Sequence, residues 1–183
     1  GILYYLRGMN AVEKSNIGLA STATEELEAL INELPKGRAK NGSDWYFGFA
    51  RNILGVHLMD LEGSYLSLQG KHDEAFKLLS EGAKKERNLG YWEPPHYSRP
   101  VLESLGNAYI RAKQYDKAVS AFGETLKIRR ESGFGYLGIA RAYSKSGNKA
   151  KATEFYKKFL DVWKNADKNL KQIKEAESWI QSN

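Results

Sequence analysis

Two adjacent stretches of equal length decide the fold. Residues 99–132 read RPVLESLGNAYIRAKQYDKAVSAFGETLKIRRES, and residues 133–166 read GFGYLGIARAYSKSGNKAKATEFYKKFLDVWKNA. Aligned without a gap, they agree at small, apolar and aromatic positions: Leu105 with Ile139, Gly106 with Ala140, Ala108 with Ala142, Tyr109 with Tyr143, Ala118 with Ala152, Phe122 with Tyr156 and Leu126 with Leu160. The polar residues between these positions differ freely, so the match indicates a structural repeat and not a duplicated active site.

The period and the order of these positions resemble the tetratricopeptide repeat, a unit of two short helices. The resemblance implies an all-α, right-handed α-α superhelix, or solenoid, of about four helix pairs with a C-terminal capping helix. In such a unit Gly106 and Ala118 are small because the paired helices approach closely there. No unit buries its own apolar face alone, so neighbouring units must stack. We therefore expect a single helical-repeat domain over residues 1–183.

Weaker copies of the pattern precede the two clear units. We expect a divergent unit at 1–34, with a helix over 2–15, a loop from Ser15 to Ala20, and a second helix that Thr22 or Thr24 caps. A further unit is expected over residues 45–88. Its first part, to about Gln69, has near-continuous helical spacing and is either one long helix or two helices with a break near Gly55.

Two segments lie outside these units. Residues 89–98 contain Pro94 and Pro95, which hold the backbone extended or turned. This Pro/aromatic insert resembles inserts between units of some bacterial tetratricopeptide repeat proteins. Residues 167–183 predict a final helix, and by resemblance a capping helix, which covers the end of an array.

Composition excludes several classes of protein. The chain has no Cys, so it has no disulfides and no thiol chemistry. No apolar run approaches the length that a transmembrane helix needs, so no membrane span is expected. Gly1 is not an initiator Met, and we interpret the chain as a fragment of a longer protein. The sequence does not distinguish cytoplasm from periplasm, and we expect no cofactor.

The net charge of +6 is unevenly distributed. Residues 99–166 carry fourteen basic and six acidic side chains, whereas residues 1–34 carry two basic and five acidic ones. Surplus positive charge in the two clear units favours an acidic partner, although a solvated Lys-rich surface explains the same counts. Nucleic acid is not expected as a partner, because the chain has no known nucleic-acid-binding module.

Candidate catalytic and metal-binding residues are few. His57 and His72 lie within helical patterns without a second ligand at metal-binding spacing, so we assign them structural roles and expect no metal site. Glu93, His96 and Tyr97 lie together in the insert, where an acid, an imidazole and a phenol suit general acid–base chemistry. An enzyme or small-ligand site around Trp92–Tyr97 is therefore one alternative, and aromatic packing of the loop is the other.

The resemblance also implies where a partner binds, because the first helix of each tetratricopeptide unit lines a concave groove. On this basis the groove residues of the two clear units are Asn107, Arg111, Arg141 and Lys145, together with Glu103, Ile110, Leu137 and Ser144. Earlier groove positions are Asp60, Ser64, Ser67 and Leu68. Asn107 matches the asparagine of carboxylate-clamp tetratricopeptide domains, but the companion lysine falls on Glu103 and the next asparagine falls on Gly138. The clamp pattern is incomplete.

These observations favour a non-catalytic scaffold that binds a peptide or protein segment in the groove, and the charge favours an acidic segment. The basic residues Arg111, Arg141 and Lys145 recur on one helical face and motivate that interpretation. An intramolecular regulatory module of a larger protein is a further alternative.

Overall fold

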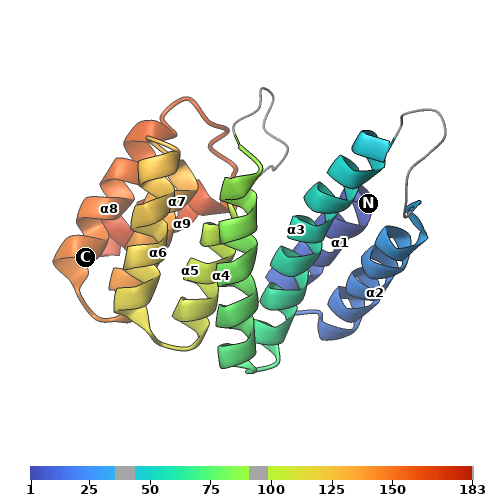
Figure 1. The fold of residues 1–183 in the computed structure, drawn as a ribbon. Coiled ribbons are helices and arrows are strands. Elements are labelled where there is room, and N and C mark those ends of the chain that lie inside the picture. The colour runs from blue at the N-terminus through green and yellow to red at the C-terminus, as the bar shows by residue number, and fades with distance from the viewer. Residues whose placement is uncertain (36–43, 91–98, 183) are drawn as a thin grey trace. The chain divides into compact units, whose positions relative to one another are not determined.

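The computed structural model describes residues 1–35, 44–90 and 99–182, and within these ranges the chain forms nine α-helices and no strand (Figure 1). The helices are α1 (Ile2–Glu13), α2 (Ile17–Glu33), α3 (Asp44–Leu68), α4 (His72–Asn88), α5 (Val101–Arg111), α6 (Tyr115–Ile128), α7 (Gly133–Lys145), α8 (Lys149–Val162) and α9 (Lys171–Ser182). The expected all-α class of helical repeats is confirmed. None of the described helices is both long enough and apolar enough to cross a membrane.

The chain divides into two compact units, which we describe separately. Unit 1 comprises Gly1–Ser104 and unit 2 comprises Leu105–Asn183, so the boundary falls inside α5. In unit 1, α1 packs on α2, α3 packs on both, and α4 pairs with α3. The core of the first three helices consists of Tyr5, Ala11, Val12, Ala20, Ala23, Leu27 and Leu61, all buried.

The start of α2 and the continuity of α3 can be compared with what the sequence predicted. The expected loop from Ser15 to Ala20 is wrong, because α2 already begins at Ile17. The capping residue is Asn16, whose side chain accepts a hydrogen bond from the Leu19 N–H at 3.0 Å. The stretch that begins near residue 45 is one helix, α3, and it passes through Gly55 without a break. Nothing lies within 4 Å of a β-carbon built on Gly55, so that glycine does not serve close packing.

Unit 2 contains most of the two clear repeats. Its helices pack in chain order, with contacts between α6 and α7, α7 and α8, and α8 and α9. The Phe122 ring lies between two glycines in its core. A β-carbon built on Gly106 of α5 meets Phe122 Cε2 at 2.6 Å, and one built on Gly138 of α7 also meets the ring. Glycine at these positions therefore lets α5 and α7 approach the ring of α6, as the repeat pattern predicted for Gly106.

One turn geometry recurs between paired helices in both units. A residue with positive φ follows the first helix of each pair: Ser15 at 55°, Gly70 at 78°, Lys113 at 59° and Gly147 at 83°. In each turn the next N–H donates to the carbonyl five residues earlier; the four bonds are Asn16 to Ala11, Lys71 to Leu66, Gln114 to Tyr109 and Asn148 to Tyr143. The turn places Gly8, Gly63, Gly106 and Ala140 at one position of the repeat. Even the divergent first pair therefore keeps this register.

Candidate functional site

The four residues expected to line the partner-binding face all lie in unit 2. α5 carries Asn107 and Arg111, and α7 carries Arg141 and Lys145 at the same repeat positions, one period later. Arg111 and Lys145 are exposed, whereas Asn107 and Arg141 are half-buried. Each helix therefore presents one exposed cation and one more sheltered polar side chain.

Arg141 binds a carboxylate from the last helix. Its Nε donates to Glu175 Oε1 at 2.8 Å and its Nη2 donates to Glu175 Oε2 at 2.6 Å, which is a bidentate ion pair. The Tyr156 hydroxyl of α8 donates to Glu175 Oε1 at 3.0 Å. Donors from α7 and α8 thus converge on one carboxylate of α9, and the planar guanidinium provides the fork geometry that carboxylates fit.

The electrostatics of this site favour a bound negative charge. Burial alone raises the pKa of Glu175, but its hydrogen bonds and attraction to Arg141, together with Tyr156 and Lys145, hold that pKa below its usual range. Burial and the neighbouring Glu175 carboxylate raise the pKa of Tyr156, so its hydroxyl keeps its proton as a donor. The site is therefore built to hold an ionised carboxylate.

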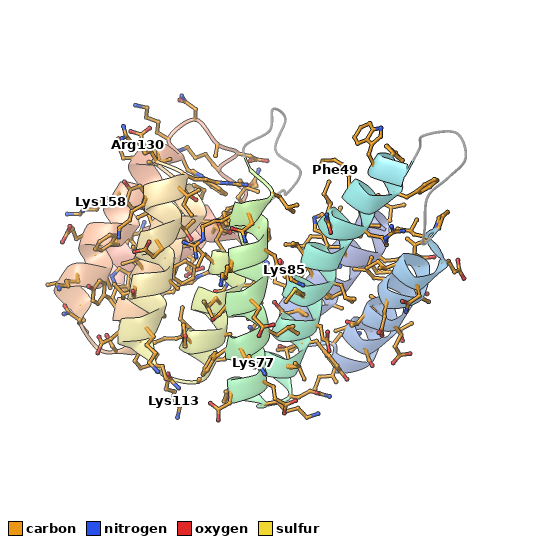
Figure 2. All side chains as sticks on the ribbon, in the orientation of Figure 1. Phe49, Lys77, Lys85, Lys113, Arg130 and Lys158 are labelled. Atoms are coloured by element: carbon orange, nitrogen blue, oxygen red, sulfur yellow. The ribbon has the colours of Figure 1, made fainter. Side chains whose placement is uncertain are left out.

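Cation–π contacts follow the same period on the surface of unit 2. Lys117 Nζ lies 5.8 Å from the centroid of the Tyr109 ring, and Lys151 Nζ lies 5.0 Å from that of Tyr143, so both partners shift by one repeat period. Other cations of this unit are exposed at its surface, among them Lys113 and Arg130 (Figure 2). Much of the positive charge of unit 2 is thus accessible to a partner.

A second polar cluster is buried in unit 1 around Asp60, which is 1% exposed. The Tyr5 hydroxyl donates to Asp60 Oδ2 at 2.6 Å. Arg99 Nη2 donates to Ser104 Oγ at 2.8 Å. Burial raises the pKa of Asp60, while the charge of Arg99 and the polar groups of Ser104 and Tyr5 act in the opposite direction.

The other members of this cluster are similarly perturbed. Burial raises the pKa of Tyr5, and the negative charge of Asp60 adds to the effect. Burial lowers the pKa of Arg99, but the combined attraction of Asp60, Tyr5, Glu103 and Glu13 outweighs burial and the net shift is upward. The negative charge of Asp60 is therefore only partly compensated, because its pKa remains raised despite Arg99, Ser104 and Tyr5.

This burial corrects part of the predicted groove. Asp60, Ser64, Ser67 and Glu103 were expected on an open surface, but they are only 1%, 2%, 2% and 6% exposed. The physical reason is that Tyr5 and Arg99 supply partners for the Asp60 carboxylate from within unit 1. In this unit the polar face is part of the interior and not a free binding surface.

The histidines outside the insert lie in helices, as expected. His57 is buried, with its ring 4.4 Å from the Tyr5 ring between centroids. Burial lowers the pKa of His57 to about 4, although a hydrogen bond with the Ile53 backbone acts in the opposite direction. His72 stacks on Phe76 at the start of α4. The remaining predicted residues, Glu93, His96 and Tyr97, lie outside the described residues.

Sequence reasoning missed Glu175, Tyr156, Tyr5 and Arg99 as members of these two sites. One signal for Glu175 was present, because a shift of one repeat period from Arg141 falls on residue 175. No comparable signal pointed to Tyr5, which contacts Asp60 across 55 residues of sequence.

Comparison with known proteins identifies the repeats. A family model described as tetratricopeptide repeat matches residues 101–132, and a second with the same description matches residues 135–162. The NMR structure of the first TPR domain of human RPAP3 is similar over 69% of this chain and 93% of that domain, with 18% identity and a TM-score of 0.51. That likeness concerns the fold alone.

Two further proteins are similar to the chain. BBSome complex member BBS4 from Bos taurus is 33% identical over 96 residues, which are 52% of this chain and 17% of that protein. The chain therefore spans less than a fifth of that curated relative. The C-terminal part of a TPR repeat-containing protein from Cytophaga hutchinsonii has 16% identity and a TM-score of 0.35, with 97% of this chain and 94% of that chain covered.

Proposed function

Because the chain is a tetratricopeptide repeat protein, we propose that it is a non-catalytic scaffold that binds an acidic protein or peptide segment. Tetratricopeptide repeats generally mediate protein–protein interaction, and scaffolds of this fold are typically not enzymes. The proposed binding face consists of Asn107, Arg111, Arg141 and Lys145 on α5 and α7 of unit 2. We refer to it below as the basic face.

The observation that carries the proposal is the bidentate contact between Arg141 and Glu175. It supports an ionised carboxylate as the functional group that this face takes. Arg111 and Lys145 occupy one repeat position on α5 and α7, and both are exposed. A segment with carboxylates of its own can reach both cations from solvent.

The charge of the surrounding surface supports the same partner. Fourteen basic and six acidic residues in 99–166 produce a positive potential that attracts an acidic segment and accelerates its association. Binding that depends on exposed charges weakens as added salt screens them. Salt dependence is therefore a second signature of the proposed interaction.

Similarity to BBS4 supports the general class of function. That relative is by name a member of a protein complex, and this chain is 33% identical to it over 96 residues. The proposal carries over only association with other proteins. The alternative of an enzyme or small-ligand site at Trp92–Tyr97 depends on residues outside the described part of the chain, and no described contact favours it.

The test is binding of a fluorescein-labelled hexaglutamate peptide, measured by fluorescence anisotropy at low and moderate salt. We expect Arg111→Ala combined with Lys145→Ala to weaken binding about tenfold, at roughly 1 kcal/mol or less for each exposed charge. The control variant combines Lys149→Ala with Lys157→Ala, which removes the same charge from exposed positions of α8.

Three results decide the proposal. Selective loss in the Arg111/Lys145 variant, with a smaller salt dependence, supports it. Equal losses in both variants indicate general attraction to a positive surface and contradict a specific face. The proposal also fails if hexaglutamine binds as well as hexaglutamate.

A further inference from the structure

Among the described helices, α9 comes last in the chain and follows the register of the repeat. Glu175 lies 34 residues after Arg141, which is one period, and the two side chains meet directly. α9 therefore lies where the first helix of a next repeat is expected, against α8 and within reach of α7. The face of α7 and α8 that contacts α9 is therefore a helix-binding surface.

That surface combines one charged contact with apolar and polar ones. Ile173 and Ala176 of α9 are fully buried in a cluster that includes Tyr156 and Phe159. Trp179 Nε1 donates to Thr153 Oγ1 at 3.0 Å. The α9-binding surface therefore comprises Arg141, Thr153, Tyr156 and Phe159, and it recognises a helix with a carboxylate, an indole and small or branched apolar residues in fixed order.

α9 is a weakly self-stabilised occupant of this surface. It has 12 residues, a length at which isolated helices are marginal in water. Its first turn contains no acidic residue and begins with Lys171, an unfavourable charge for the helix N-terminus. Its position thus depends on packing and on the Glu175 contact, and not on its own helical propensity.

We propose that the α9-binding surface is a second partner site, and that its partner is a carboxylate-bearing amphipathic helix of another protein that replaces α9. In this exchange the partner's carboxylate takes the place of Glu175 between Arg141 and Tyr156. Displacement of α9 also releases Arg141 to the basic face. The inference rests on the proposed function for the identity of the basic face. It adds that the partner of the second site is a helix, and that the position of α9 controls whether Arg141 is accessible to ligands of the basic face.

The test uses the full chain and a labelled peptide with the sequence of residues 167–183, which serves as the model partner helix. Glu175→Ala in the protein weakens the resident α9 as a competitor. We expect that variant to bind the labelled peptide about tenfold more tightly than the unmodified chain, because the lost contact is a charge-assisted hydrogen-bonded pair. Glu177→Ala is the matched control, since Glu177 is an exposed carboxylate of the same helix.

A second peptide tests the carboxylate itself. The same peptide with alanine in place of its Glu175 residue is expected to bind the Glu175→Ala protein about tenfold more weakly. Hydrogen exchange of the α9 amides is expected to accelerate when the unmodified peptide is added, because α9 leaves its surface.

The outcomes separate this inference from the proposed function. Equal peptide affinity for the Glu175→Ala, Glu177→Ala and unmodified chains overturns the exchange. So does equal binding of the two peptides, or α9 amides whose exchange is unchanged at saturating peptide. Hexaglutamate binding that depends on Arg111 and Lys145 is measured independently, so either idea can fail while the other stands.

Discussion

Arg141 and Glu175 are separated by one repeat period of 34 residues and form a bidentate ion pair, which joins α7 to α9. In a stacked helical repeat, residues one period apart occupy the same position on adjacent units, so their side chains are natural neighbours. Here the repeat position changes from a cation on α7 to an anion on α9. The shift of 34 residues that aligns the two clear units therefore also relates Arg141 to its ion-pair partner Glu175.

Acidification should release α9 before it unfolds the rest of unit 2. The pKa of Glu175 in the folded chain is below its usual range. Such a carboxyl contributes stability that is present above the unfolded pKa and is lost as pH falls below that value. We expect α9 amides to exchange faster as pH falls through and below about 4.3, after correction for the intrinsic pH dependence of exchange.

The control for this prediction is Glu175→Gln, which removes the titrating group but keeps a similar shape. In that variant α9 should exchange faster already at neutral pH and should show little further acid-dependent loss. An α9 that is protected equally at neutral and acidic pH in the unmodified chain contradicts the prediction.

Residues one period apart could be predicted from sequence, whereas contacts outside the period could not. Tyr109 and Tyr143 identified equivalent helices, and the structure places Lys117 and Lys151 over them in equivalent contacts. Burial of Asp60 was missed because its partner Tyr5 lies 55 residues away, in a helix pair whose sequence has diverged. The sequence does not show whether a polar residue at a groove position forms its hydrogen bonds with solvent or with another side chain.

Removal of the Tyr5 hydroxyl should destabilise unit 1. Tyr5→Phe leaves the ring in the core but deprives Asp60 Oδ2 of a donor at 2.6 Å, and Asp60 is fully enclosed. Loss of a hydrogen-bond partner from a buried polar group costs about 1–3 kcal/mol. Urea unfolding should therefore show a lower midpoint with an unchanged slope. Tyr46→Phe is the control, because Tyr46 is 58% exposed, and an equal effect of both substitutions would argue against a special role for the Asp60 contact.

His57 should make the stability of unit 1 depend on pH below neutrality. Its folded pKa is about 4, whereas its usual value is 6.5, so the unfolded chain binds a proton that the folded chain excludes. Stability therefore falls as pH drops from about 6.5 towards 4, by about 3 kcal/mol at most. His57→Gln should flatten this part of the stability–pH curve relative to the unmodified chain. An equally steep curve for the His57→Gln variant and the unmodified chain contradicts the prediction.

Glycines on either side of Phe122 should not tolerate a methyl group. Gly106→Ala and Gly138→Ala each place a β-carbon against the ring, and overpacking of this kind costs about 1–3 kcal/mol. Alanine has the higher helix propensity, by about 1 kcal/mol, which reduces the net loss. Gly123→Ala in α6 provides the matched control, because nothing lies within 4 Å of its added methyl group. Thermal unfolding should show lower midpoints for the first two variants and a higher midpoint for the third.

Lys113→Gly should stabilise the turn between α5 and α6. Lys113 adopts a φ of 59°, whereas the equivalent positions of two other turns are Gly70 and Gly147. A left-handed backbone costs a residue with a β-carbon about 1 kcal/mol that glycine avoids, although glycine also loses more conformational freedom on folding. Since all of these turns keep the same hydrogen bond to the carbonyl five residues earlier, the substitution leaves the geometry intact. We expect a rise in the unfolding midpoint for Lys113→Gly and none for Lys113→Ala, which retains the β-carbon; equal midpoints for the two variants would show that the turn stores no backbone strain.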